Sequence, residues 1–126
     1  MTKLEHFEQK NEYAVFCPVG QASFAEVSEL ISRAVLRCRK EKIEKLLIDS
    51  TRVPKFRPPD MAERFKLAER IASDAESSVK IAHVASPDWV RSGRFGVMVA
   101  NNRGLDVKHF TLETAAVKWL LMSTRK

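Results

Sequence analysis

Five residues that suit the binding of a ligand or partner follow segments that we predict to be strands. They are Arg57, Asp60, Arg64, Trp89 and Arg91. Because open α/β sheets bind ligands beyond the carboxyl ends of their strands, we expect this set to form a binding edge. Two members also have an ordinary structural alternative, since Asp60 complements a helix start and Trp89 suits a cap on the core. The set contains no catalytic constellation.

Residue types that carry acid–base, nucleophilic or metal chemistry are present but are not spaced for it. His6, His83 and His109 fall on three predicted strands, and the apolar run around His83 is typical of a buried, hydrogen-bonded imidazole. Cys17 and Cys38 match neither a metal-ligand spacing nor a redox motif, so we expect two free thiols. The chain has no glycine-rich phosphate loop and no GxSxG motif. We therefore expect no enzymatic activity, no cofactor and no metal.

Hydrophobic periodicity predicts strands that alternate with helices. The expected order is a hairpin over 4–17, a helix over 23–40, a strand over 43–48, a helix over 58–72, a strand over 79–85, a helix from 89 or 91 to 102, a strand over 106–110 and a helix over 111–120. This order predicts an α/β fold with one mostly parallel sheet of four to five strands, an N-terminal β-hairpin and about four helices. No linker or internal repeat interrupts it, so we expect a single domain over 1–126.

Several residues predict where these elements end and which sides they bury. Ser23 and Glu26 have capping-box spacing, Gly104 suits a left-handed helix end, and Thr111 suits the cap of the last helix. We expect the last helix to bury one face, made of Leu112, Ala115, Ala116, Trp119 and Leu120.

The composition favours a folded cytoplasmic protein. Of 126 residues, 44% are hydrophobic and 30% are charged, which excludes disorder over most of the length. Lys and Arg number 22 against 16 Asp and Glu, a formal net charge of +6 that is ordinary for a small soluble domain. No stretch has the roughly 20 apolar residues of a membrane span, and Met1–His6 lacks the apolar core of a signal peptide.

From Phe7 to Leu120 the chain resembles the SpoIIAA-like family, small bacterial single-domain proteins related to the STAS domains of anti-sigma-factor antagonists. Three segments in this order carry the resemblance: Leu46–Asp49, Lys80–Ala85 with Asp88 and Trp89 after it, and Val107–Thr111 leading into Ala115–Leu120. The resemblance implies a sheet of four or five strands with helices packed on it. It also implies function by protein–protein contact and no enzymatic role.

The sequence departs from the phosphoswitch members of the STAS group. Those members carry Asp-Ser-Ser-Gly at the start of the second helix, where serine accepts a phosphate. Here that position falls near Arg57-Pro58-Pro59-Asp60, and proline has no hydroxyl. Ser50 and Thr51 lie earlier, at the end of a predicted strand. We therefore expect no phosphorylation at the start of the second helix.

The sequence as a whole predicts a non-enzymatic regulatory or binding domain that contacts a protein partner or a small ligand through residues 52–70. An apolar-ligand or lipid-binding domain of CRAL-TRIO-like type is the alternative, which a lined internal cavity would favour. Nucleic-acid binding through the basic end of the first helix is a weaker alternative. The basic residues there are Arg33, Arg37, Arg39, Lys40, Lys42 and Lys45. Their ordinary role is to complement the negative end of the helix macrodipole. The sequence leaves open the identity of the partner and the oligomeric state, a homodimer included.

Overall fold

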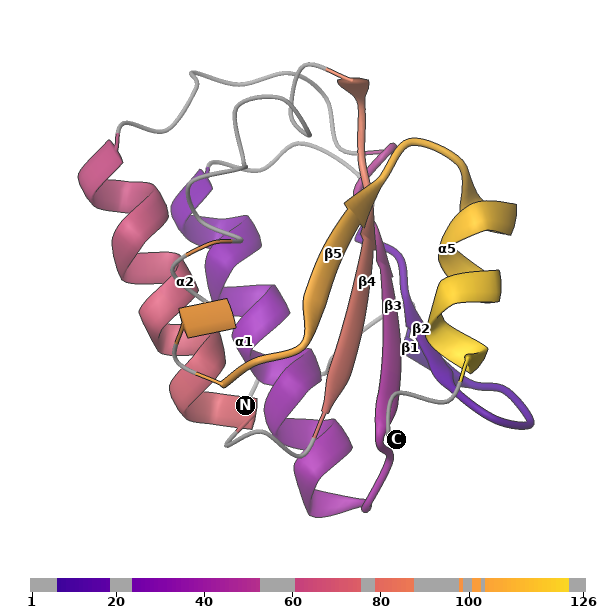
Figure 1. The fold of residues 1–126 in the computed structure, drawn as a ribbon. Helices are drawn as coiled ribbons and strands as arrows, with labels where there is room; N and C mark the ends of the chain where they lie inside the picture. The colour runs from indigo at the N-terminus through magenta and orange to yellow at the C-terminus, as the bar shows by residue number, and fades with distance from the viewer. Residues whose placement is uncertain are drawn as a thin grey trace.

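The computed structural model describes residues 7–18, 24–52, 61–75, 79–87, 98, 101–102 and 104–122. Its sheet has five strands: β1 (Phe7–Gln9), β2 (Ala14–Phe16), β3 (Lys45–Asp49), β4 (Lys80–Val84) and β5 (Val107–Phe110). Its described helices are α1 (Phe24–Lys40), α2 (Met61–Ala75) and α5 (Glu113–Leu121). Helices α1 and α2 cover one face of the sheet and α5 covers the other (Figure 1). The α/β class expected from the sequence is confirmed.

The strands lie in chain order, β1-β2-β3-β4-β5. The hairpin pairs β1 with β2 antiparallel, and the other three pairings are parallel. Each parallel strand lies on the same side of the strand before it, and the crossovers between parallel strands are right-handed. The helices in successive crossovers therefore lie on the same face of the sheet, as α1 and α2 do. We call the end of the sheet at Phe16, Asp49, Val84 and Phe110 the carboxyl edge, and the opposite end the amino edge. Both α1 and α2 begin at the carboxyl edge (Figure 1).

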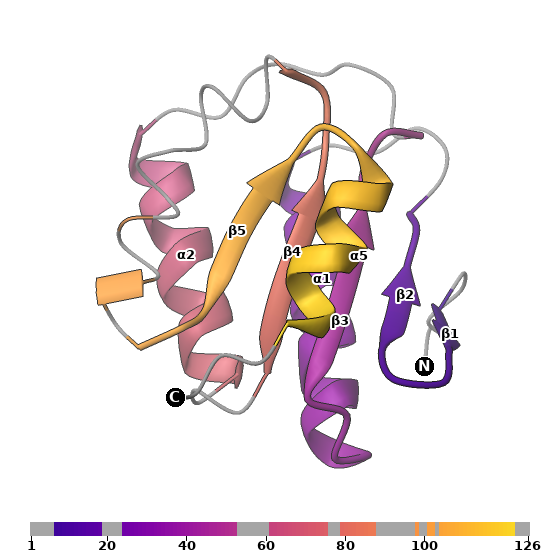
Figure 2. The same ribbon diagram turned by 45° about the vertical axis from the view of Figure 1, so that its right-hand side comes forward.

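Alternation along the strands divides the apolar side chains between two cores. Leu46, Ile48 and Ile81 face α1 and α2 and pack with Phe16 and Ile31. The alternate residues face α5, which lies across β3 and β4 (Figure 2). This second core contains Leu47, Ala82, Val84, Ala116 and Leu120. Because β3 and β4 are covered on both faces, their sequences are the near-continuous apolar runs that predicted them.

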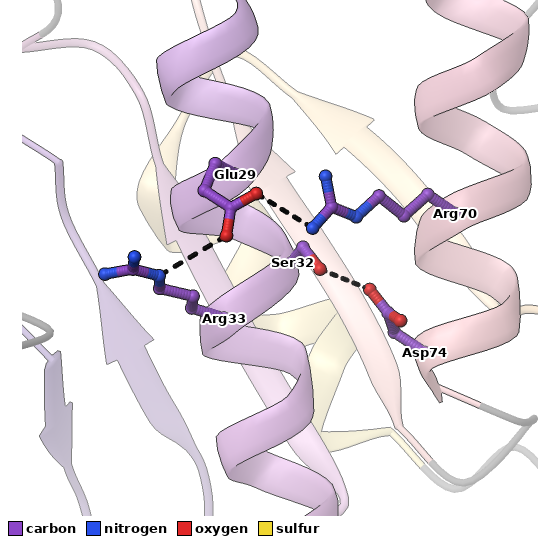
Figure 3. Close-up of polar contacts among 5 residues, drawn as sticks. All are labelled: Glu29, Ser32, Arg33, Arg70 and Asp74. Atoms are coloured by element: carbon purple, nitrogen blue, oxygen red, sulfur yellow. Dashed lines mark hydrogen bonds and ion pairs between the residues drawn. The ribbon is translucent and has the colours of Figure 1, made fainter. Parts of the chain in front are cut away.

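Polar contacts join α1 to α2 along their seam (Figure 3). Ser32, which is buried, donates a hydrogen bond to the carboxylate of Asp74. Arg70 contacts Glu29 at 2.8 Å, and Glu29 also pairs with Arg33 at 3.5 Å. The Arg70 hydrogen bond and charge lower the pKa of Glu29. Exposed ion pairs contribute little stability, so these contacts mainly fix how the two helices lie against each other.

The last helix differs from its expected start and face. It begins at Glu113 with Leu112 as its N-cap and no side-chain cap, so the expected cap at Thr111 is wrong. Leu112 has extended backbone and its carbonyl accepts the Ala116 amide at 3.1 Å, which leaves Thr111 outside the helix. Leu112 is 65% exposed and Ala115 is also exposed, so the expected buried face is wrong at both residues. The fully buried residues are Ala116 and Leu120, one helical turn apart.

Other expected boundaries have mixed outcomes. The first helix begins at Phe24, as expected, although Ser23 lies outside the described residues. Residues 53–60, which include the expected start of the second helix, also lie outside them. Of the helix expected to end at 102, only Met98, Asn101 and Asn102 are described, and they are helical. Gly104 has a φ of 90°, which confirms its left-handed conformation. Within the described ranges, no helix is long and apolar enough to cross a bilayer.

Candidate functional site

The five residues expected to form the binding edge lie almost wholly beyond the described part of the chain. Arg57, Asp60, Trp89 and Arg91 fall outside it. Arg64 lies in the first turn of α2, near the carboxyl edge, but its side chain is not among those described. Their convergence therefore stays a prediction.

Three polar side chains from neighbouring strands lie together at the carboxyl edge. His83 on β4 pairs in register with Ile48 on β3 and with His109 on β5. Ser50 lies two residues after Ile48, and strand alternation places it on the same face as Ile48. That face is the one covered by α1 and α2, because Ile48 belongs to their core. We call Ser50, His83 and His109 the Ser–His–His cluster.

A side-chain hydrogen bond and a ring contact join the members of the cluster. Ser50 Oγ and His83 Nε2 are 2.8 Å apart, and the two residues are 8% and 6% exposed. The rings of His83 and His109 meet edge to face, with centroids 4.9 Å apart. Nδ1 of His109 is buried and has no hydrogen-bond partner among the described residues. Ser50 and His83 are therefore buried beneath the surface of the carboxyl edge, while His109 is partly exposed.

Burial keeps both imidazoles uncharged near neutral pH. Desolvation lowers the pKa of His83 well below 6.5, and the charge of His109 lowers it further. Desolvation also lowers the pKa of His109 to about 4. Removing an ionisable ring from water disfavours its charged form, so each ring binds a proton less readily than an exposed histidine.

The Ser50–His83 hydrogen bond has the residue types of a catalytic nucleophile and its general base. A distance of 2.8 Å suits a serine activated by histidine. However, an effective base has a pKa near the working pH, and burial moves the pKa of His83 far below it. The Ser50 hydroxyl is also buried, and its backbone N–H donates to the Val84 carbonyl at 2.9 Å. The cluster is better suited to holding β3 and β4 together than to acyl transfer.

The opposite face of the carboxyl edge carries charged groups beside Cys17. Asp49 Oδ1 accepts hydrogen bonds from the Thr51 amide at 2.9 Å and the Thr51 hydroxyl at 2.6 Å, which ends β3 in a tight polar turn. Burial and the charges of Asp49 and Glu113 raise the pKa of Cys17, while Arg52 lowers it. A thiol with a raised pKa is a poor nucleophile.

Both cysteines are free thiols, as expected. Burial raises the pKa of Cys38 to about 12, so this thiol stays protonated. In the described part of the chain, no three His, Cys, Asp or Glu residues lie close enough to share a metal ion.

The arginines behind the nucleic-acid alternative have partners within the fold. Arg33 pairs with Glu29, and Arg39 donates to the Asp74 backbone carbonyl at 2.8 Å. Arg37 pairs with Glu41 at 3.0 Å, and its guanidinium carbon lies 4.4 Å from the centre of the Phe7 ring. These contacts favour a structural role for the three arginines.

The sequence alone does not bring the three members of the cluster together. The burial and hydrogen bonding expected for His83 are confirmed. The signal that could have joined them is that Ser50, His83 and His109 all stand at or near the carboxyl ends of predicted strands. Their contact depends on the register between strands, which strand patterns do not fix by themselves.

No protein-family model matches the chain, and no curated protein matches its sequence significantly.

Proposed function

We propose that this chain is a non-enzymatic regulatory or binding domain of the STAS-related, SpoIIAA-like type, which contacts a protein partner through residues 52–70. The observation that carries this proposal is the position of α2. This helix begins at the carboxyl edge, where β2 to β5 also end (Figure 1). The segment between β3 and α2 therefore starts and finishes at the edge where open α/β sheets bind their ligands.

The charge of this segment favours an acidic partner. Arg57 and Arg64 stand seven residues apart with Asp60 between them, and the chain as a whole has a formal net charge of +6. Within the described part of α2, Lys66 is exposed and Ala68 and Ala72 are buried, while the exposed Arg70 is already paired with Glu29. A partner held by such charges would bind less tightly as the salt concentration rises.

The Ser–His–His cluster supports a non-catalytic role. Its hydroxyl is buried, and burial lowers the pKa of the histidine that would serve as the base. A catalytic serine needs access to substrate and a base that titrates near the working pH. The cluster supplies neither condition.

Affinity capture with matched variants tests the proposal. The wild-type chain, an Arg57→Ala/Arg64→Ala variant and a Lys40→Ala/Lys118→Ala variant are each used as bait in native extract. The control removes two positive charges from exposed sites on α1 and α5. We expect one interactor that the wild-type and control baits retain, that the arginine variant loses, and that salt releases. Equal retention by all three baits would contradict the proposal.

A further inference from the structure

An apolar stripe runs along one side of α5. Its members follow one another at intervals of three, four and three residues, the spacing of one helical face: Leu112, Ala115, Trp119 and Met122. Leu112 is 65% exposed and Met122 is 55% exposed, Ala115 is also exposed, and Trp119 is partly buried. We call these four residues the α5 stripe. The fully buried residues of α5 are different ones, so the exposed members of the stripe do not hold the helix on the sheet.

The α5 stripe lies on the side of the helix toward β5. The centre of the Trp119 ring is 5.7 Å from that of Phe110, the last residue of β5. Alternation along β5 places Lys108 on the same face of the sheet as Phe110. Helix α5 lies across β3 and β4, and β5 lies to one side of it (Figure 2). Among the described helices, α5 is the one on this face of the sheet, so the stripe adjoins this side of β5.

Positive charge borders the α5 stripe. Lys108 is exposed, and its Nζ lies 5.6 Å from the centre of the Phe110 ring. Lys118 is exposed on α5, next to Trp119 in the chain. Among the ion pairs of the described residues, none involves Lys108 or Lys118. Two ammonium groups therefore stand beside apolar side chains without a described carboxylate partner.

The acidic residues at the starts of β5 and α5 act on other groups. Asp106, just before β5, favours the charged form of Lys80. Glu113, the first residue of α5, acts on the thiol of Cys17, which follows β2 on the other side of the helix (Figure 2). Neither carboxylate forms a described ion pair with the two lysines that border the stripe.

We propose that the α5 stripe is a second interaction surface, which binds an acidic amphipathic helix of a partner protein. Apolar residues at positions i, i+3 and i+7 of such a helix match the spacing of the stripe, and carboxylates on its flanks match Lys108 and Lys118. The surface lies on the opposite face of the sheet from α2, so it is independent of any contact through residues 52–70. The nine residues of α5 span about 14 Å, so the contact is small, and we expect it to be weak and readily reversible.

The same charges argue against two other occupants. A second copy of the chain would set Lys108 and Lys118 against the same two lysines across a two-fold axis, and like charges in an interface are unfavourable. A lipid surface resting on α5 would meet Lys118 first, because this residue lies two positions from each of the buried Ala116 and Leu120 and so points away from the sheet. An acidic helix beside α5 and over β5 would contact the stripe and both lysines.

An NMR titration with a designed peptide tests the surface. The probe is a helical peptide of about 15 residues with one face of leucines at i, i+3, i+4 and i+7 spacing and glutamate on its flanks, and its twin carries lysine in place of each glutamate. We expect the glutamate peptide to shift the amide signals of Ala115, Lys118 and Trp119 but not those of Ala68 and Ala72 in α2, and rising salt to weaken its binding. It should bind at least about threefold more tightly than its twin. Equal affinity of the twins, shifts confined to other elements, or no shift with the glutamate peptide would overturn the proposal.

Matched variants assign the binding to the stripe. Leu112→Gln/Met122→Gln removes two exposed apolar side chains of the stripe, and the control Leu36→Gln removes one from α1, where Leu36 is 44% exposed. A dispersed amide spectrum and an unchanged urea midpoint show that each variant is folded. We expect the double variant to weaken the glutamate peptide by at least about fivefold and Leu36→Gln to leave its affinity unchanged. Lys108→Glu should remove the preference for the glutamate peptide. Wild-type affinity in the folded double variant would overturn the proposal.

Two further measurements examine the other occupants. In sedimentation equilibrium without peptide, the wild-type chain should not dimerise through the stripe, and a dimer that Leu112→Gln/Met122→Gln dissociates would assign the stripe to a second copy. Phosphatidylglycerol vesicles should leave the signals of Ala115 and Trp119 in place, and binding to these vesicles instead of the glutamate peptide would assign the stripe to a membrane. Either result would overturn the proposal.

Discussion

Lys80, at the start of β4, fastens the end of α5 to the sheet through Trp119. Its Nζ donates to the Trp119 carbonyl at 2.7 Å and to the Met122 carbonyl at 3.1 Å. The ammonium also lies 4.3 Å from the centre of the Trp119 ring. The Trp119 carbonyl also accepts the Met122 amide at 3.2 Å, and a cation at the end of a helix complements the helix dipole. Burial lowers the pKa of Lys80, which shows that placing the charged ammonium at this position carries a desolvation cost.

Replacing Lys80 should therefore loosen α5. We expect Lys80→Met, which keeps much of the apolar stem, to lower the free energy of unfolding by about 1.5–3 kcal/mol, the usual worth of hydrogen bonds to a charged group. Lys118→Met on the exposed side of α5 is the control and should change stability by less than about 0.5 kcal/mol. Urea denaturation of both variants measures the difference. Equal midpoints would show that Lys80 does not anchor the helix.

Adjacent leucines at the end of α5 should respond very differently to truncation. Leu120 is fully buried beneath the helix, whereas Leu121 is 37% exposed. We expect Leu120→Ala to cost about 2–5 kcal/mol and Leu121→Ala less than about 1 kcal/mol. Denaturant midpoints of the two variants provide the comparison. If Leu121→Ala were the more damaging change, the buried face of α5 would be misassigned.

Trp119 is partly buried, so its truncation should cost less than that of a fully buried tryptophan. The ring packs 5.7 Å from that of Phe110 and lies beneath the Lys80 ammonium. The loss of about 3–5 kcal/mol typical of a fully buried aromatic is therefore an upper limit here.

Global stability should fall as the pH drops below about 6.5. Burial lowers the pKa of His83 and His109 in the folded state, so the unfolded chain binds more protons between about pH 6.5 and the folded values. Stability is then fully present above about pH 6.5. It declines by up to about 1.4 kcal/mol per pH unit for each ring, down to about pH 4 for His109. Urea titrations at several pH values measure the slope, and His109→Phe should reduce it. A variant with an undiminished slope would assign the acid sensitivity to carboxylates instead.

An anti-sigma-type serine kinase should place no phosphate at the start of α2. On the proposed STAS-like resemblance, Pro58 and Pro59 fall where phosphoswitch STAS proteins carry serine, and neither has a hydroxyl. Ser50 is buried and donates or accepts a hydrogen bond with His83, which makes it a poor substrate. Phosphopeptide mapping after incubation with such a kinase is the measurement. A stoichiometric phosphate on Ser50 or Thr51 would contradict the expectation.

Structural features that depend on a local sequence pattern could be predicted from the sequence. The apolar runs of β3 and β4 identified buried strands because both faces of each are covered, and Gly104 identified a left-handed residue. The N-cap of α5 is not where the sequence predicts it. Threonine is a preferred N-cap residue and leucine is not, yet the backbone places Leu112 rather than Thr111 at the N-cap. Intrinsic preference is a weak guide when tertiary context sets where a helix starts.

The Ser–His–His cluster could not be predicted in the same way. Its members come from three segments far apart in the chain, and their contact depends on the pairing of His83 with both Ile48 and His109. A shift of one residue in either pairing would have moved a side chain to the other face of the sheet. The apolar residues around His83 therefore predict that its imidazole is buried, but they do not predict which side chains it contacts.

Site-specific photo-crosslinking tests the proposed binding surface most directly. A photoreactive residue is placed at position 57, 64 or 118 in otherwise unchanged chains, which are then irradiated in native extract. Position 118 is exposed on α5, away from α2, and serves as the control. We expect a discrete adduct with the same partner from positions 57 and 64, and none from position 118. Adducts from position 118 alone, or the same adduct from all three positions, would contradict it.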